Sequence, residues 1–567
     1  MIYIKKIRTF LIISCFSLII LLPQINQHAL IIGGDSSFHW NRIYDAMMQI
    51  KNGNFQYFIS MYGFSQSGRI VNALYGPYVA YFNGFIMLIT GSWFKYQILS
   101  DWILNIIAAW SMYYLLISNK VKQNYSIWLS LLFVTSYSIS TWTLNQQFLA
   151  WGTAIMPLGI AAASRMIRNR NNQISIIELT ISVTLLIQTH ILSAIFLIII
   201  LIIFFVFGVI ISSNRWLMIK NIFISVILTI LLTSNIWGSL LEVYGSNQLL
   251  APFTNLYPLN NGVVQFLSNT NQLSIGFAII LSAQMVFCVC YYSKIALLNK
   301  LVTIVGSILF IMSTQLLPWN TIFTVFPLVS IIQFPYRLLA PATILLILGV
   351  GLSLTKLSDE TIKKPDNKLI ILGTLIVIST LVSLGNIQNK AAFWRTNEVV
   401  ASRYNVTQRL TGGELRMKYR TQNMGEVLKY VWKPAPDYLP RVHTKNSESP
   451  YRQYQKEIET NNNFIKKTEN SKLIISWTSK NTNPIIVSVV KYRHTKLTLN
   501  QKMLKNSDYT LSGIGAIQLT PKIGRNALVV EYVPSYIFRL LMIVNAISWI
   551  GVLGWSGIWF KKRLNSN

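Results

Sequence analysis

Charged residues, and acidic residues above all, are scarce in this sequence. Only 12% of the 567 residues are charged, whereas about 25% is usual in a soluble globular domain. The chain has 18 Asp and Glu against 49 Lys and Arg, which gives a formal net charge of +31. So small a charged fraction excludes an ordinary soluble protein and indicates surface that faces lipid, where charge is costly.

Cysteine is almost absent as well. Cys15, Cys288 and Cys290 are the three cysteines, and all of them lie within apolar runs. This placement excludes a disulfide framework and predicts no metal site. The sequence also contains no Walker loop, dinucleotide-binding fingerprint, zinc-ligand spacing or Gly-x-Ser-x-Gly motif, so no cofactor is evident.

Long apolar runs are the feature that the sequence has in abundance. Hydrophobic residues make up 52% of the chain, and runs of about 17–25 such residues are long enough to span a bilayer as helices. The first run lacks a small-residue cleavage site, so we expect an uncleaved membrane helix rather than a signal peptide. We predict an α-helical polytopic membrane protein with about twelve transmembrane helices, over 8–22, 96–117, 125–142, 148–164, two within 175–211 that separate at Gln188–His190, 221–237, 273–291, 301–317, 338–355, 368–385 and 536–560.

Lys and Arg set the expected orientation, because cytoplasmic loops are rich in these residues. With the N-terminus inside, every basic cluster between the expected helices falls on the cytoplasmic side, and the C-terminus does too. If the run 72–92 crossed the membrane, the basic clusters that follow it would fall on the outer side. We therefore expect this run to be a helix that lies at the outer interface. The clusters are Lys120 and Lys122; Arg165, Arg168 and Arg170; Arg215 and Lys220; Lys294 and Lys300; Lys356, Lys363 and Lys364; and Lys561, Lys562 and Arg563.

The same patterns divide the chain into three parts. Residues 1–385 form the expected transmembrane domain, with a large first outer loop at 23–95. Residues 386–535 lose the apolar runs and hold 24 Lys and Arg against 10 Asp and Glu, so we expect an extracytoplasmic domain. Residues 536–567 are the final helix and a short basic tail. Short alternating runs predict strands, and hence a small β-sandwich, at 472–477, 485–492, 497–499, 516–519 and 527–532.

Asp35 is the leading candidate for chemistry, since few acidic residues reach the outer side. Apart from the domain at 386–535, Asp35, Asp45 and Glu242 are the acids expected there. On a helix that starts near Asp35, His39 and Arg42 fall on the same face as this aspartate. The alternative is that Asp35 is an N-cap, which an Asp after two glycines suits well.

Three further residues are candidates on the outer side. His190 stands at the expected turn between two helices, where it either caps the preceding helix or contacts a phosphate. Arg337 precedes a helix, where its guanidinium either snorkels or binds a lipid phosphate. Glu242 lies in an outer loop and is either solvated or part of an acceptor site. Arg69 reads as an ordinary surface residue.

Several segments, taken in order, resemble bacterial membrane glycosyltransferases of the C-type fold. Within these the chain is most similar to the branch called pyruvoyl-tetrahydropterin-synthase-related membrane proteins, although nothing here indicates pterin chemistry. The resemblance is spread over most of the chain and depends on order and spacing. The segments are Gly34–Arg42 (GDSSFHWNR), Lys51–Phe55 (KNGNF), Tyr75–Phe82 (YGPYVAYF), Gln188–His190 (QTH), Gln333–Arg337 (QFPYR), Pro436–Pro440 (PDYLP) and Ala527–Tyr532 (ALVVEY).

The resemblance implies transfer of a sugar from a polyprenyl-phosphate donor to a cell-envelope acceptor, on the outer face of a bacterial cell membrane. An acidic residue of the first outer loop acts as general base or positions the acceptor in such enzymes, and Asp35 matches that place. Arg337, His190, His39 and Arg42 would contact the lipid phosphate, and Glu242 the acceptor. The family often has an acidic pair where this chain has Ser36 and Ser37, so a divalent metal is not implied.

Two other functions stay open at this point. A non-catalytic relative would keep the fold for envelope assembly, and a flippase would move a lipid-linked intermediate. Membrane lipids and the lipid-linked sugar are the expected partners, and the basic outer domain suits anionic envelope polymers. We expect no nucleic-acid partner, because the basic residues follow the membrane topology.

Overall fold

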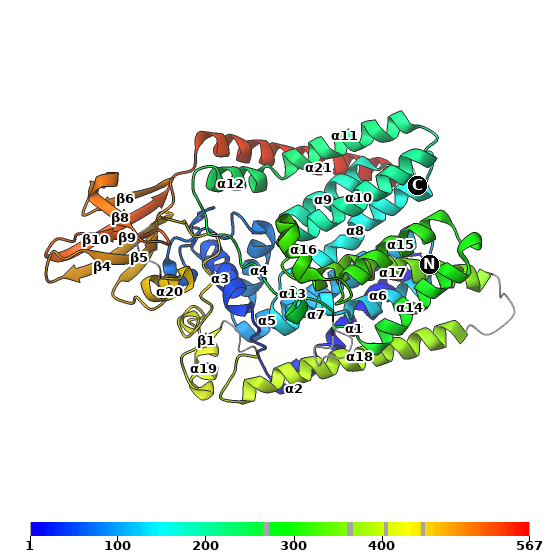
Figure 1. The fold of residues 1–567 in the computed structure, drawn as a ribbon, viewed down its shortest axis with the longest axis horizontal. Helices are drawn as coiled ribbons and strands as arrows, with labels where there is room; N and C mark the ends of the chain where they lie inside the picture. Colours follow the sequence, from blue (N-terminus) through cyan, green and yellow to red (C-terminus); the bar gives the residue numbers. More distant parts are fainter. Residues whose placement is uncertain (1, 265–271, 360–366, 402–405, 444–447, 566–567) are drawn as a thin grey trace.

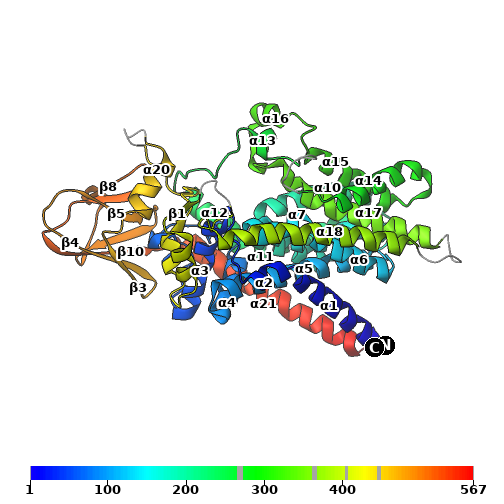
Figure 2. The same ribbon diagram turned by 90° about the horizontal axis from the view of Figure 1, so that it is seen from below.

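The computed structural model describes residues 2–264, 272–359, 367–401, 406–443 and 448–565. Most of these residues form a helical body, and a β-rich region lies at one end of it (Figures 1 and 2). Both chain termini lie at the opposite end (Figure 1).

Twelve helices form the first part of the body. They are α1 (Ile2–Ile19), α2 (Leu22–Gln27), α3 (Ser36–Asn52), α4 (Pro77–Thr90), α5 (Trp93–Ser118), α6 (Gln123–Val134), α7 (Tyr137–Asn145), α8 (Leu149–Arg168), α9 (Ile176–Thr189), α10 (Ile191–Ile211), α11 (Arg215–Leu232) and α12 (Ser234–Tyr244).

The second part of the body follows an outer segment. It contains α13 (Pro258–Asn261), α14 (Ile275–Cys290), α15 (Leu297–Met312), α16 (Trp319–Val325), the short 3₁₀ helices η3 (Pro327–Ile332) and η4 (Pro335–Leu338), α17 (Leu339–Asp359) and α18 (Asn367–Ala392). The final helix α21 (Tyr536–Asn565) packs against α11 and α12.

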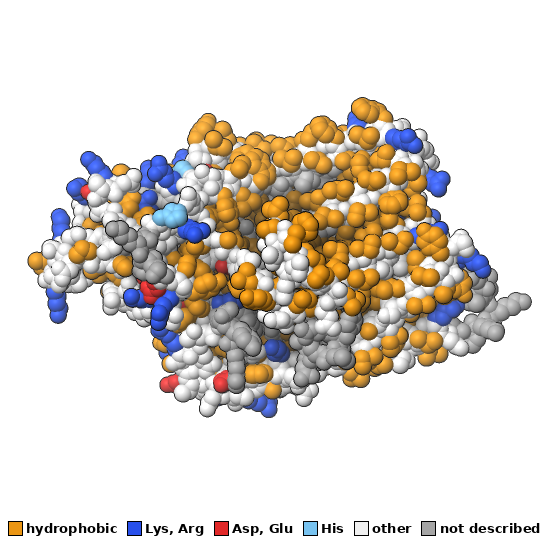
Figure 3. Space-filling model, in the orientation of Figure 1, with side chains coloured by type: hydrophobic (Ala, Val, Ile, Leu, Met, Phe, Trp, Pro, Cys, Tyr) orange, Lys and Arg blue, Asp and Glu red, His pale blue; other side chains and the backbone are white. Residues whose placement is uncertain are grey.

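Seven helical stretches within the described residues are long and apolar enough to cross a membrane. They are Trp93–Ser118, Gln123–Asn145, Ile191–Ile211, Arg215–Leu232, Pro335–Asp359, Asn367–Arg395 and Tyr536–Trp555. Hydrophobic side chains cover the visible face of the helical body, and basic side chains gather towards its two ends (Figure 3). These features suggest a membrane protein.

Four apolar helices, α4, α9, α14 and α15, are shorter than the seven long stretches. The 14 residues of α4 extend about 21 Å at 1.5 Å per residue, less than the roughly 30 Å of a bilayer core. However, α9, which the sequence predicts to span, also has 14 residues, so the interfacial position expected for residues 72–92 stays a prediction. The expected total of about twelve spans stays a prediction.

Two expected helices are interrupted in the structure. The helix expected over 125–142 breaks after Val134, because Ser136 has an extended backbone with ψ of 146° and starts α7. The helix expected over 221–237 ends at Leu232, and α12 begins after Thr233. By contrast, the break expected at Gln188–His190 is confirmed, since α9 ends at Thr189 and α10 starts at Ile191.

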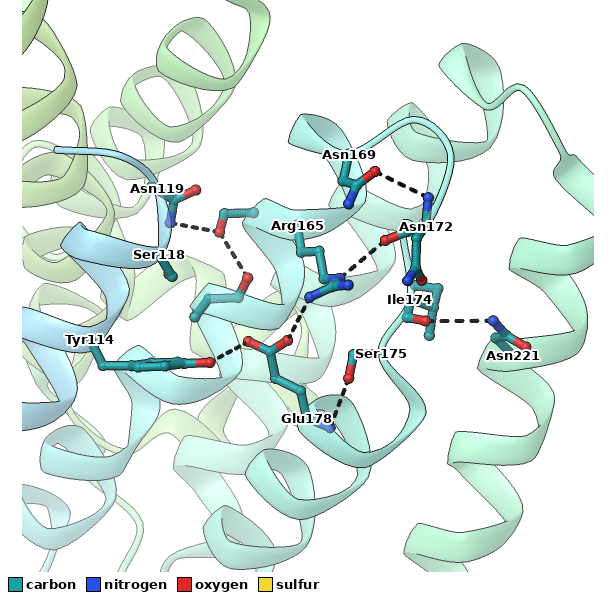
Figure 4. Close-up of polar contacts among 12 residues, drawn as sticks. Tyr114, Ser118, Asn119, Arg165, Asn169, Asn172, Ile174, Ser175, Glu178 and Asn221 are labelled. Atoms are coloured by element: carbon teal, nitrogen blue, oxygen red, sulfur yellow. Dashed lines mark hydrogen bonds and ion pairs between the residues drawn. The ribbon is translucent and has the colours of Figure 1, made fainter. Parts of the chain in front are cut away.

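Several basic residues lie at the end of the body that holds the two chain termini. Lys122 pairs with Asp359 at 2.6 Å, and Lys356 donates to the backbone carbonyl of Lys294. At the α8–α9 turn, Glu178 accepts a hydrogen bond from Tyr114 at 3.1 Å and lies 3.6 Å from Arg165 (Figure 4). Lys363 and Lys364 lie outside the described residues.

The β-rich region is a two-sheet sandwich, and all five expected strands are confirmed. Side chains from both sheets, such as Ile475, Val489 and Val530, are buried between them. One sheet has the order β3-β4-β10-β6-β7 and the other β5-β9-β8. The strands are β3 (Ile465–Glu469), β4 (Lys472–Ser479), β5 (Ile485–Val490), β6 (Thr495–Leu499), β7 (Lys502–Met503), β8 (Tyr509–Leu511), β9 (Ala516–Leu519) and β10 (Gly524–Tyr532).

A more irregular segment connects α18 to the sandwich. It contains β1 (Thr407–Gln408), paired with β2 (Val431–Trp432), and the helices α19 (Gly412–Tyr419) and α20 (Pro450–Tyr454). This segment lies beside α3 (Figure 1).

The first outer loop is buried between the helical body and the sandwich. Its Phe58 and Ile70 share a hydrophobic cluster with Tyr492 and Tyr532. The Asp45 carboxylate is fully buried and accepts from the backbone N–H groups of residues 61, 62 and 63 at 2.7–3.0 Å. Backbone groups buried away from water need partners of this kind, so Asp45 has a structural role.

The start of this loop packs backbone to backbone on the end of α7. Gly33 donates to the Gln146 side chain at 2.7 Å, and Asp35 donates its backbone N–H to the Asn145 carbonyl at 3.1 Å. A Cβ on Gly33 would stand 2.3 Å from the Asn145 Cα. Only glycine therefore allows this approach, which fixes the backbone of Asp35.

We predict that Gly33→Ala lowers the stability of the folded protein by about 1–3 kcal/mol or more, because the added methyl group overlaps backbone that cannot move aside. Gly413→Ala is the matched control, since nothing lies within 4 Å of a Cβ there, and in α19 it should be neutral or stabilise by about 0.5–1 kcal/mol. Thermal unfolding of the detergent-solubilised proteins compares them. Equal midpoints for both variants would contradict the close contact.

Candidate functional site

The Asp35 carboxylate makes an ion pair with the segment that follows β2. Lys433 Nζ lies 2.7 Å from Asp35 Oδ1 and donates to the Gly34 carbonyl at 3.2 Å. The two side chains are 22% and 36% exposed for Lys433 and Asp35, so the pair is reachable from outside. Asp35 occupies the N-cap position of α3 but makes no side-chain capping bond. The capping interpretation is therefore wrong, because the Asp35 backbone (φ −106°, ψ 2°) lacks the extended conformation that a capping side chain usually needs.

A second carboxyl group lies in the same region. Asp437 is four residues beyond Lys433, and burial raises the pKa of its carboxyl; the Asp35 charge adds to this, while Arg69 and Lys433 oppose it. Arg69 is fully buried and donates to the Asp437 carbonyl at 2.7 Å. Its guanidinium also lies over the Tyr454 ring at 5.1 Å. Arg69 is thus not the surface residue we expected, because it joins the first outer loop to the outer domain.

His39 and Arg42 share the face of α3 that the sequence predicts, and both are buried. Arg42 donates to the Asn72 side chain at 3.0 Å and to the Tyr75 carbonyl. Its third contact is with His39 Nδ1 at 3.1 Å, and its guanidinium lies 4.7 Å from the Phe148 ring. The Arg42 guanidinium therefore holds the turn before α4 in place, because it donates hydrogen bonds to backbone carbonyls of that turn.

His39 and His190 are both neutral at physiological pH. Burial, followed by the charge of Arg42, holds the pKa of His39 well below its usual 6.5. Burial, Arg337 and Arg42 lower the pKa of His190 to about 3. Neutral imidazoles can donate or accept hydrogen bonds to a phosphate but cannot neutralise its charge.

His190 has a specific structural place. Its Nδ1 accepts from the backbone N–H of Ser193 at 3.2 Å, so it caps the N-terminus of α10. The expected cap at the end of the preceding helix is wrong, because the imidazole points to the following turn. The ring also meets Tyr75 edge to face at 5.8 Å, which places His190 next to the Arg42 turn.

Arg337 is half-buried in η4. It donates to the Gln333 side chain at 2.7 Å and to the Ile332 carbonyl at 3.2 Å, and it lies 5.0 Å from the Phe334 ring. Its neighbour Tyr336 donates to Gln147 at 3.3 Å, just beyond the α7 end that holds Asp35. The positive end of the α17 dipole disfavours a guanidinium at this place. The hydrogen bonds from Arg337 to the Gln333 amide and the Ile332 carbonyl offset that cost.

Glu242 lies apart from these groups. It is buried rather than solvated, and its two oxygens accept from the backbone N–H and the hydroxyl of Ser535 at 2.8 and 2.5 Å. His494 Nε2 is 3.9 Å away. Glu242 therefore fixes the start of α21 on α12, and its contact with an acceptor stays a prediction.

Sequence reasoning did not single out Lys433 or Asp437. Asp437 lies within the PDYLP segment that carried part of the resemblance, which was the available signal. Lys433 is one of 24 basic residues in its domain, so only the fold distinguishes it. Among the described residues, no group of three or more His, Cys, Asp or Glu side chains could hold a metal ion.

We predict that His190 makes the protein acid-labile. Its pKa is lower in the folded state, so its contribution to stability is complete above about pH 6.5 and is lost as pH falls towards 3. The loss at pH 5 amounts to about 2 kcal/mol. His190→Asn should narrow the fall in unfolding midpoint between pH 7 and pH 5, since Asn keeps a capping oxygen.

His28→Asn is the control for this titration. His28 is exposed, and its φ of 48° is a conformation that Asn tolerates. This variant should lose stability with acid as the wild type does. A wild-type pH dependence in His190→Asn would show that the buried imidazole does not titrate as described.

Comparison with known proteins adds no relative to this description, since no family model matches the chain and no curated protein matches it. Asp35, Lys433, Asp437 and Arg337 are charged residues of the candidate site.

Proposed function

We propose that this protein is a membrane glycosyltransferase of the C-type fold. It moves a sugar from a polyprenyl-phosphate carrier to a cell-envelope acceptor. The observation that carries the proposal is the position of Asp35, whose partly exposed carboxylate lies where the helical body, the first outer loop and the outer domain meet. That is the place of the acidic residue in the enzymes that the sequence resembles.

Asp35 acts as the general base of the reaction. The acceptor oxygen attacks the anomeric carbon, its proton passes to the carboxylate, and the bond between that carbon and the phosphate oxygen breaks. A positioned base contributes about 10²–10⁴-fold to such a step. We expect inversion at the anomeric carbon, on resemblance alone.

Arg337 and Lys433 are the groups that stabilise the departing lipid phosphate. Its negative charge grows as the bond breaks, so fixed cations favour the transition state. Arg42 is fully engaged by backbone and ring contacts, and His39 and His190 are neutral. These three residues therefore shape the site, while Arg337 offers a planar fork for phosphate oxygens.

The proposal includes a membrane arrangement. The helical body spans a bacterial cell membrane about twelve times, with both termini in the cytoplasm and residues 386–535 outside. Support comes from the apolar surface of the body (Figure 3) and from the grouping of basic clusters at the end opposite the sandwich. Dependence on a divalent metal is left open.

Asp35→Asn should abolish sugar transfer, because the amide keeps the shape but cannot accept the proton. We expect a loss of about 10²–10⁴-fold in proteoliposomes supplied with radiolabelled polyprenyl-phosphate sugars. Asp359→Asn is the matched control, since it removes an aspartate from another Asp–Lys pair at the opposite end of the body. The Asp359→Asn protein should transfer sugar at the wild-type rate.

Other outcomes would assign other functions. Equal transfer by the Asp35→Asn protein and the wild type would show that Asp35 is structural. Passage of the donor across the bilayer without covalent product would indicate a flippase. A folded Asp35→Asn protein that still restores envelope assembly in cells would indicate a scaffold.

The outer domain is proposed to bind anionic envelope polymers. Its exposed cations include Lys496, Lys502, Lys505 and Arg525 on the sandwich. We predict that affinity of the full-length protein for a teichoic-acid-type polymer falls as salt rises, because the attraction is electrostatic. A Lys502→Gln/Lys505→Gln variant should bind more weakly. Affinity that does not change with salt would refute this role.

A further inference from the structure

Two stretches of the body carry no charge at all: one joins an outer segment to α14, and the other joins most of α15 to a second outer segment. From Val243 to Ser293, and again from Leu301 to Tyr336, the sequence contains no Asp, Glu, Lys or Arg. By contrast, residues 386–535 hold 24 basic and 10 acidic residues. About a quarter of the residues in a water-exposed domain are charged, so these segments do not have the composition of a solvated loop.

The described parts of these segments hold each other in place outside the helical bundle. Leu259 donates its backbone N–H to the Asn320 side chain at 3.2 Å, and Gln333 donates to the Phe253 carbonyl. We call residues 253–261 and 316–332, which contain α13, α16 and η3, the apolar lip. In Figure 2 α13 and α16 project sideways beyond α15, at the end of the body nearer the sandwich.

Large apolar side chains of the lip are exposed together. Leu328 is 91% exposed, and six others are between 60% and 70% exposed: Leu256, Tyr257, Leu316, Val325, Phe326 and Ile331. Exposed apolar residues of the sandwich, such as Met503 and Ile523, stand among charged neighbours instead. A clustered apolar surface of this kind marks a contact with lipid or with another protein.

We propose that the apolar lip lies in the outer leaflet of the bilayer, parallel to the membrane surface. The surface of the lip continues into the exposed apolar faces of α14 and α15, where Ile275 and Ile308 are 69% and 53% exposed. The lip itself contains no Asp, Glu, Lys or Arg with which to pair with a charged protein surface. Its short helices satisfy much of their own backbone, as segments at the membrane interface must.

This placement brings Arg337 to the level of the lipid headgroups. Gln333, at the end of the lip, binds both the Phe253 carbonyl and the Arg337 guanidinium. A lipid phosphate can therefore reach Arg337 from within the leaflet, between the lip and the helical body. The inference requires only a bilayer, so it stands or falls separately from sugar transfer.

Depth measurements on the full-length protein in lipid nanodiscs test the lip. Cys15, Cys288 and Cys290 are first replaced by Ala, and a polarity-sensitive fluorophore is attached at Leu328→Cys. We expect blue-shifted emission that is quenched by lipids with a nitroxide high on the acyl chain and protected from iodide. The same label at Ile523→Cys, which is 71% exposed on the sandwich, should be quenched by iodide alone.

Each other pattern overturns the proposal. Quenching of the Leu328→Cys label by iodide alone would place the lip in water. Protection from both iodide and nitroxide lipid would place it against protein, either a second copy or a partner. A label at Ile230→Cys on α11, where the residue is 48% exposed, serves as the reference for contact with lipid.

Discussion

The burial of the first outer loop is the constraint on which the site depends. A loop enclosed between the helical body and the outer domain cannot leave its backbone groups to water, and each unpaired group would cost roughly 1–3 kcal/mol. The Asp45 carboxylate accepts hydrogen bonds from three successive N–H groups of the loop. Arg42 donates to the backbone carbonyl just before α4, and Arg69 donates to the carbonyl of Asp437. The charged side chains of the loop thus hold its shape, and Asp35 is left with one oxygen paired to Lys433.

The same constraint explains why the cations near Asp35 differ in what they can do. Arg42 and Arg69 are fully buried and donate to backbone carbonyls, so neither can turn to a substrate without leaving a buried carbonyl unpaired. Lys433 has a flexible stem and few fixed contacts, so it can follow a moving negative charge. Arg337 is held by one amide and one carbonyl, and it is half-buried rather than enclosed. Mobile or partly open cations are the ones suited to a charge that develops during reaction.

Much of the fold follows from periodicity, but the site does not. The five expected strands and the break at His190 follow from local signals that tertiary packing reinforces. The breaks after Val134 and Leu232 were missed, because a continuous apolar run gives no sign that Ser136 or Thr233 will end a helix. The common face of Asp35, His39 and Arg42 follows from helical spacing, whereas the meeting of Asp35 with Lys433 joins residues 398 positions apart. No local pattern predicts such a pair.

Charge distribution joins these features into one electrostatic picture. Lys and Arg exceed Asp and Glu by 31 over the chain. Because residues 243–293 and 301–336 carry no charge, this excess lies on the rest of the molecule. The outer domain alone contributes 24 positive against 10 negative residues. Asp35 and Asp437 are therefore two neighbouring carboxyl groups in a positive surrounding, beside Lys433 and Arg69. A surrounding of this sign attracts an anionic lipid or polymer over roughly one Debye length, about 8 Å at physiological salt. In the reaction that we propose, these cations would offset the repulsion between the Asp35 carboxylate and the lipid phosphate.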